Sequence, residues 1–93
     1  MYVMRLPQLG MGMTDADVVR WLAAEGDLIV QDSPLLLIET AKAGMELVAP
    51  VAGVLRRILA PNGSTVDVGH PLALIGDPSE PLPADLENLA HGA

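Results

Sequence analysis

The fold of this chain is decided by the stretch Ile38-Glu39-Thr40-Ala41-Lys42-Ala43-Gly44-Met45-Glu46-Leu47. It reads as an apolar strand, a short polar turn and a second apolar strand, which predicts a β-hairpin with Lys42 at its turn. Lys42 is the only lysine in the chain. An ammonium group at a hairpin tip projects away from its own sheet, so another protein can reach and acylate it. An ordinary solvated turn has the same local pattern, and the rest of the chain has to decide between the two interpretations.

Composition limits both the core and the chemistry. The 93 residues include no Phe, no Cys, one Trp and one Tyr, so we expect one small domain with an aliphatic core. Without cysteine the chain has no disulfide, no thiolate metal site and no cysteine nucleophile. His70 and His91 lack the spacing of metal ligands. No nucleophile–base pair is apparent, and we expect the chain to catalyse nothing by itself.

The net charge of −7 argues against a nucleic acid or an anionic membrane as partner, because both would repel the surface. No apolar run approaches the length of a membrane span. The N-terminus begins directly with a strand-like pattern and shows no export signal. We therefore expect a soluble intracellular domain that is monomeric when isolated.

An internal repeat indicates the architecture. Shifting the chain by 37 positions lays residues 14–38 over residues 51–75 with eight identities. The identical pairs are Arg20 and Arg57, Leu22 and Leu59, Ala23 and Ala60, Gly26 and Gly63, Pro34 and Pro71, Leu35 and Leu72, Leu37 and Leu74, and Ile38 and Ile75. Neither half can bury its apolar side alone, so the two halves should pack as a pseudo-symmetric pair.

The repeat also settles residues 15–26, which by themselves fit either a helix capped by Thr14 or Asp15 or a β-branched strand. The second copy, residues 53–63, ends in Pro61 and an Asn-Gly turn signal, which favours a strand in both copies. We predict an all-β fold, a small flattened barrel or sandwich of two antiparallel sheets with a pseudo-twofold repeat, also described as a barrel-sandwich hybrid.

Two further segments lie outside the repeat. The Gly-rich loop of residues 8–13 lacks the third glycine of a dinucleotide fingerprint and the lysine of a P-loop. It is either a flexible loop that presents methionines to partners or a purely structural loop. Residues 77–93 contain several prolines and acids and no lysine or arginine, which is typical of a solvated linker. We predict a folded domain over residues 1–76, with Lys42 at the end opposite to the linker.

The ordered motifs resemble the lipoyl domains of the acyltransferase (E2) components of 2-oxo acid dehydrogenase complexes, over about residues 3–76. They are Leu6-Pro7-Gln8-Leu9-Gly10, Val19-Arg20-Trp21-Leu22, Glu25-Gly26-Asp27, Ile38-Glu39-Thr40-Ala41-Lys42-Ala43, Ala49-Pro50 with Gly53, and Gly63 with Pro71-Leu72.

The resemblance implies that Lys42 carries lipoic acid in amide linkage. It assigns Glu39 and Gly53 to recognition by the lipoate-attaching enzyme, together with Thr40, Ala41 and Ala43 around the lysine. The implied function is a swinging arm that carries acyl groups and reducing equivalents between a thiamine-dependent E1, the E2 catalytic domain and the flavoprotein E3. The implied compartment is the bacterial cytoplasm, or the mitochondrial matrix in a eukaryote.

The sequence departs from the family pattern at three places. Ala41 replaces the usual acidic residue before the lysine, Ala16 replaces a glycine, and Asp32-Ser33 replaces a Gly-Asp turn. The Asp32 turn is acceptable only if it avoids positive φ or if aspartate tolerates it there. The loss of the acid at position 41 can alter docking to a partner enzyme or the choice of attaching enzyme.

Three alternatives stay open at this point. A biotin carrier has the same fold and a lysine in the same hairpin, but usually flanks that lysine with methionines. An unmodified interaction module with a lipoyl-like fold is the second alternative. A glycine-cleavage carrier is disfavoured because it usually has extra helical segments. The sequence leaves open whether the complex handles a 2-oxo acid or an acetoin-type substrate.

Overall fold

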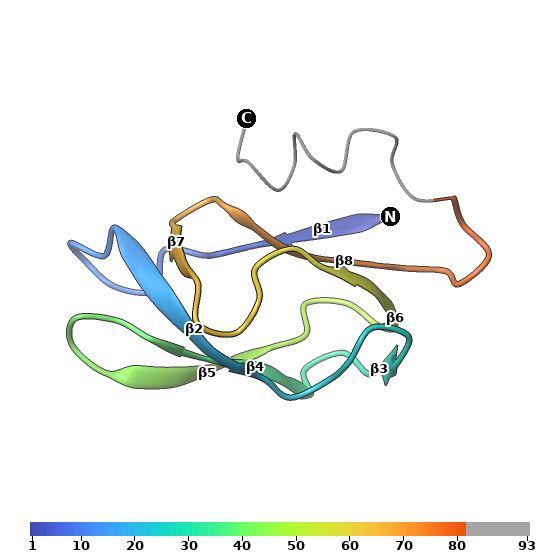
Figure 1. Ribbon diagram of the computed structural model, residues 1–93, viewed down its shortest axis with the longest axis horizontal. Helices are drawn as coiled ribbons and strands as arrows, with labels where there is room; N and C mark the ends of the chain where they lie inside the picture. Colours follow the sequence, from blue (N-terminus) through green and yellow to red (C-terminus); the bar gives the residue numbers. More distant parts are fainter. Residues whose placement is uncertain (82–93) are drawn as a thin grey trace.

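The computed structural model describes residues 1–81, which form a flattened sandwich of two four-stranded antiparallel sheets without a helix (Figure 1). One sheet has the strand order β1-β8-β6-β3 and the other has the order β5-β4-β2-β7. The all-β prediction is confirmed. The strands are β1 (Tyr2–Arg5), β2 (Asp15–Trp21), β3 (Leu28–Ile29), β4 (Pro34–Glu39), β5 (Gly44–Val48), β6 (Gly53–Ile58), β7 (Thr65–Asp67) and β8 (Pro71–Gly76).

The two sheets are built from equivalent strands. A shift of 37 positions carries β2, β3 and β4 onto β6, β7 and β8, and the sheet orders match if β5 is equivalent to β1. The register matches as well, because Val18 lies opposite Ile38 in one sheet and Leu55 lies opposite Ile75 in the other. Both pairings then shift by one residue at the same equivalent position. The repeat predicted from sequence is therefore a structural repeat.

Backbone hydrogen bonds join the halves reciprocally. The N–H of Gly26 donates to the carbonyl of Leu55, and the N–H of Gly63 donates to the carbonyl of Val18, both at 2.7 Å. Each glycine adopts a positive φ, +95° for Gly26 and +88° for Gly63, a conformation open to glycine at little cost. The turn of each half thus binds the long strand of the other half.

A pair of side chains repeats this exchange. The Trp21 N–H donates to the Asn62 side-chain oxygen at 2.9 Å, and the Ile58 N–H donates to the Glu25 carboxylate at 2.8 Å. The two acceptors precede the two turn glycines, and the two donors are the last residues of β2 and β6. These bonds satisfy N–H groups at the strand ends that the sheets leave unpaired.

The core is aliphatic, as the composition predicts, and contains no buried polar or charged side chain among the described residues. Trp21 is the one aromatic member, and its indole N–H donates to the Ala60 carbonyl at 2.7 Å. The largest side chains with almost no exposure are Leu6, Val18, Leu35, Leu36, Ile38, Leu55, Pro71, Leu72, Leu74 and Ile75.

The structure resolves two local questions raised by the sequence. Residues 15–21 form β2, so the strand interpretation of the ambiguous segment is confirmed. Asp32 has a φ of 70°, so the turn keeps its positive φ and aspartate accepts it. Its repeat equivalent, Gly69, has a φ of +89°, which shows that both halves use the same turn geometry.

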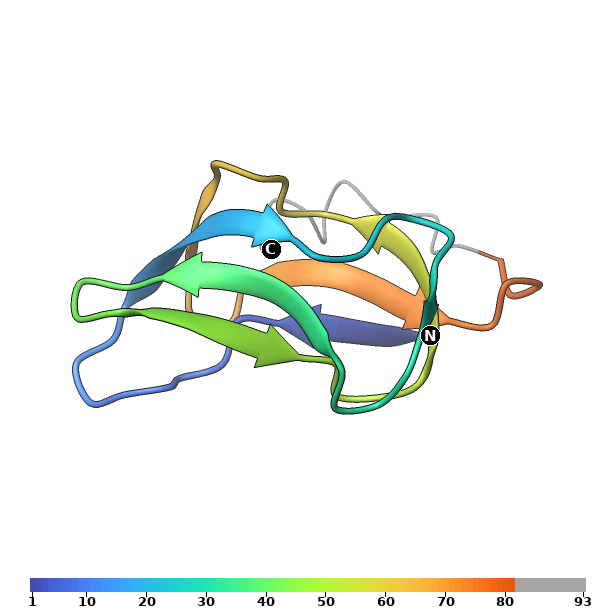
Figure 2. The same cartoon turned by 90° about the horizontal axis from the view of Figure 1, so that it is seen from below.

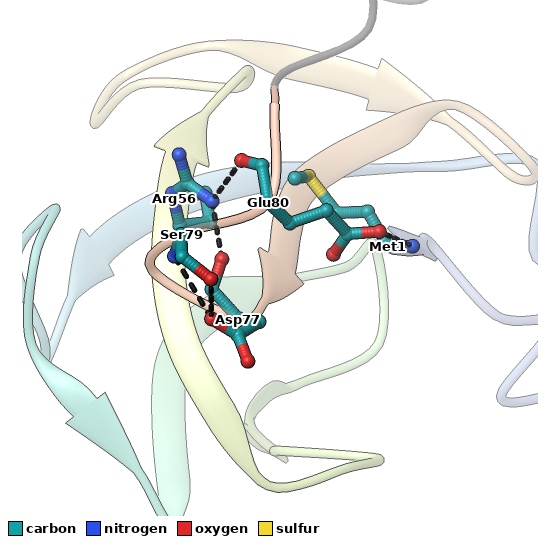
Figure 3. Close-up of polar contacts among 5 residues, drawn as sticks. All are labelled: Met1, Arg56, Asp77, Ser79 and Glu80. Carbon is teal, nitrogen blue, oxygen red and sulfur yellow. Dashed lines mark hydrogen bonds and ion pairs between the residues drawn. The ribbon is translucent and has the colours of Figure 1, made fainter.

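At the end of β8 the chain folds back on the sheet (Figure 3). The Arg56 guanidinium donates to the carbonyls of Asp77 and Glu80, and the terminal amine of Met1 pairs with the Glu80 carboxylate at 2.9 Å. Strand β8 ends at Gly76, the last residue of the predicted domain, and the division of the chain at this point stays a prediction. Residues 77–80 form a turn held by Arg56, while residues 82–93 of the predicted linker lie outside the described residues.

Replacing Asn62 tests the reciprocal pairing. We expect Asn62→Ala to lower the free energy of unfolding by about 1 kcal/mol, because the part-buried N–H of Trp21 loses its acceptor. Asn62→Asp keeps an oxygen at the same position and should cost less. Urea unfolding followed by circular dichroism measures both values, and equal losses in the two variants would contradict the assignment.

Asp77 gives a pH-dependent prediction. The hydroxyl and the backbone N–H of Ser79 donate to the Asp77 carboxylate and hold its pKa below the ordinary value of 3.8, with a smaller contribution from Arg56. A lowered folded-state pKa stabilises the fold above the unfolded pKa, and this contribution disappears as the pH falls through the folded pKa. We expect Ser79→Ala to raise the pKa of Asp77 in a carboxyl NMR titration. An unchanged midpoint would show that Ser79 does not stabilise the carboxylate.

Candidate functional site: the lysine hairpin and the adjoining loop

Strands β4 and β5 form the predicted hairpin, with residues 40–43 as its turn (Figure 2). Thr40 organises the turn: its N–H and its hydroxyl both donate to the Ala43 carbonyl, at 2.9 and 3.0 Å. The Thr40 hydroxyl oxygen also accepts the N–H groups of Lys42 and Ala43, each at 3.3 Å. The turn therefore has a defined shape although its residues are mostly exposed.

Lys42 occupies an exposed position in this turn, with no hydrogen bond or ion pair from its amine among the described residues. The turn lies at the end of the sandwich opposite to the N-terminus and the turn after β8 (Figure 1). Glu39, the last residue of β4, is exposed beside it and pairs with Gly44. The structure thus brings Glu39, Thr40, Ala41 and Ala43 together with Lys42.

Gly53 is not part of this group. It lies on β6 beside Gly76, at the end of the sheet where Met1 and Glu80 meet. Its φ is +152°, and a Cβ there would lie 3.1 Å from the Ile75 side chain and 3.2 Å from the Gly76 carbonyl. Close packing of the backbone is a sufficient reason for this glycine, and its role in recognition by an attaching enzyme stays a prediction.

The loop after β1 lies beside the hairpin (Figure 2). Together they line an open cavity of about 200 Å³, to which the loop contributes residues 9–14, the start of β2 contributes Asp15, and the hairpin contributes residues 40–43 and Met45. The Gln8 side chain shapes the loop by donating to the carbonyls of Gly10 and Met13, at 2.6 and 2.9 Å. Lys42 is therefore one wall of a largely apolar hollow.

Sequence reasoning did not place this loop at the lysine. The length of the loop is a signal that the sequence does contain. In the repeat, Leu6 is equivalent to Ala49 and Thr14 is equivalent to Val51. Seven residues, Pro7 to Met13, lie between Leu6 and Thr14, whereas Pro50 alone lies between Ala49 and Val51. The loop is therefore much longer than the equivalent connection in the other half, with seven residues against one.

Within residues 1–81 no group of three or more His, Cys, Asp or Glu side chains could hold a metal ion. No helix of the described chain is long and apolar enough to cross a membrane.

A family model described as "Biotin-requiring enzyme", covering biotin and lipoyl attachment, matches residues 2–75. The chain belongs to the biotin/lipoyl attachment family. This attachment domain is homologous to the lipoyl domains of E2 acyltransferases, and the family consists of carrier domains. This chain is 40% identical over 79 residues to the acetyltransferase component of the pyruvate dehydrogenase complex of Corynebacterium glutamicum. The matched segment covers 85% of this chain and 12% of that protein.

Another curated relative and a solved structure are also similar to this chain. The acetyltransferase component of the acetoin cleaving system of Pseudomonas putida is 38% identical, over 80% of this attachment domain and 20% of that protein. The solution structure of the lipoyl domain of the 2-oxoglutarate dehydrogenase complex from Azotobacter vinelandii matches with a TM-score of 0.68 at 27% identity, covering 83% of this chain and 98% of that one. The chain therefore spans a small part of the curated relatives and nearly all of a single lipoyl domain.

Thr40 offers a test of the turn. We expect Thr40→Ala to speed amide hydrogen exchange at Lys42 and Ala43 by roughly two- to tenfold, because one or two hydrogen bonds of about 0.5–1.5 kcal/mol are lost. Thr40→Ser keeps the hydroxyl and should change the rates little. NMR exchange measurements check this, and equal rates in both variants would show that Thr40 does not order the turn.

Proposed function

We propose that this domain is a lipoyl carrier and that Lys42 is its attachment site. The observation that supports this is the position of the only lysine: it is exposed, in an ordered hairpin turn, at the end of the sandwich remote from the N-terminus. The homology to E2 lipoyl domains supports the choice of lipoic acid. The residues fit such a group, because the Lys42 amine is accessible for an amide bond and has no competing partner among the described side chains.

The protein supplies attachment, reach and recognition, and the chemistry belongs to the group it carries. When attached, lipoic acid supplies a disulfide that accepts an acyl group together with two electrons. The hairpin holds the amine outward, and Thr40 fixes the turn that an attaching enzyme reads. Glu39 places a carboxylate near the lysine, and we propose that it takes part in this recognition. Gly53 is retained in the same proposal, although it lies in the other sheet, at the end of the sandwich remote from the lysine turn.

We further propose that the domain works inside a multienzyme complex, between an E1 decarboxylase, an E2 catalytic domain and an E3 flavoprotein. Residues 77–93 would tether it, and a tether raises the effective concentration of the lysine at successive active sites. By their names, the relatives are parts of a pyruvate dehydrogenase complex, a 2-oxoglutarate dehydrogenase complex and an acetoin cleaving system, and we propose a substrate of that class for the complex that contains this domain. A bacterial complex would place the domain in the cytoplasm.

Biotin is the second candidate, and the description of the family model favours it. The residues flanking the lysine favour lipoic acid, because both neighbours, Ala41 and Ala43, are alanines and Met45 lies three positions away. An unmodified interaction module is the third candidate, and the missing acid at position 41 is the feature that supports it.

Co-expression with a lipoate-attaching enzyme and with a biotin-attaching enzyme separates the three. We expect intact-mass analysis to show one lipoyl group on the wild-type domain and none on Lys42→Arg, with no mass change in the biotin arm. Both proteins should have the same melting temperature, since the side chain is exposed. A biotin adduct alone would identify a biotin carrier, and an unchanged mass in both arms would leave only the interaction module.

A further inference from the structure

The loop of residues 8–13 is ordered although the fold does not need its length. In the equivalent position of the other half, Pro50 alone makes the same connection between equivalent strands. Even so, the Met13 N–H donates to the Gly10 carbonyl at 3.1 Å and the Leu9 N–H donates to the Met13 sulfur at 3.4 Å. With the two bonds from the Gln8 side chain, these contacts give the loop a fixed shape that closure of the sandwich does not explain.

This fixed loop lines a cavity together with the lysine hairpin and with Thr14 and Asp15, which lead from the loop into β2. The volume of about 200 Å³ exceeds the roughly 150 Å³ of a cavity that holds a benzene ring. Lys42 is part of the lining, so a group attached to its amine begins at the rim of the cavity.

The lining has a distinctive chemistry. Three of the five methionines of the chain, Met11, Met13 and Met45, line it, together with Leu9. Thioethers are polarisable and adapt to irregular apolar guests. Met11 is 92% exposed, the most exposed of the large hydrophobic side chains among the described residues. Ala41 and Ala43 leave the hairpin side free of charge except for Lys42 itself, and amide formation removes that charge.

We propose that this cavity is a seat for the dithiolane ring of the lipoyl group on Lys42. The inference depends on the proposed function, since it needs that group to be attached. A five-membered ring of three carbons and two sulfurs is apolar and of a size that the cavity admits. The seat is shallow and open to solvent, so the arm would exchange between a docked form on its own domain and a free form available to partner enzymes.

Methionine NMR tests the seat directly. In domain labelled at the methionine methyl groups, Met11, Met13 and Met45 report on the cavity, while Met1 at the far end and the buried Met4 are internal controls. The comparison uses domain lipoylated at Lys42 and domain acetylated at Lys42, which has lost the same charge but carries no ring. We expect larger methyl shifts in the lipoylated form at the three cavity methionines only, and NOEs from the ring protons to those methyls.

Two variants sharpen the test. Met11→Gln should weaken the ring NOEs at Met13 and Met45, because it removes an apolar wall without disturbing the fold. Leu28→Gln is the matched control: Leu28 is also strongly exposed, at 79%, but lies on β3 away from the lysine turn, and this variant should keep the NOEs.

The outcomes separate the seat from the carrier function. An intact mass with one lipoyl group, combined with methyl shifts equal to those of the acetylated domain and no ring NOEs, overturns the seat and leaves the carrier function standing. A bare Lys42 in the mass spectrum overturns both.

Discussion

The structure depends on the exchange of hydrogen bonds between two equivalent halves. The turn at Gly26 binds the strand that contains Leu55, and the turn at Gly63 binds the strand that contains Val18, with the same 2.7 Å separation. Neither half has a partner for these groups inside itself, so each half is complete only when the other is present. This explains how a chain of 93 residues without phenylalanine or a disulfide can close an aliphatic core from short strands.

The exchange also fixes where the two ends of the sandwich point. Strands β8 and β1 pair as β4 and β5 do, with Ile75 opposite Tyr2 and Ile38 opposite Met45, but only the second pair is joined by a turn. The pseudo-twofold therefore places the unjoined strand ends and the lysine turn at opposite extremities (Figure 1). The symmetry alone therefore places the lysine turn at the opposite end of the sandwich from the end of β8.

The sequence predicted much of this because the repeat is visible as a shift of 37 positions and because glycine marks both exchange turns. The same overlay selected a strand for residues 15–21, where local propensity was ambiguous. Other features depend on tertiary context and were not predictable. Gly53 stands in a linear motif with Lys42 but lies in the other sheet, at the opposite end of the sandwich, because β5 carries the chain from the lysine turn to that end before β6 begins at Gly53. The turn held by Arg56 at residues 77–80 is fixed by long-range contacts from β6.

The loop before β2 shows what symmetry can reveal about function. Where two halves share register, bulges and turn geometry, a segment present in one half only is not required by the fold. Residues 8–13 are such a segment, and they lie next to the only lysine. The internal hydrogen bonds of Gln8 and Met13 keep the loop in one shape, so its cost in conformational entropy is met by local contacts. The largest departure from symmetry therefore lies beside Lys42, and comparison of the equivalent strands is what locates it.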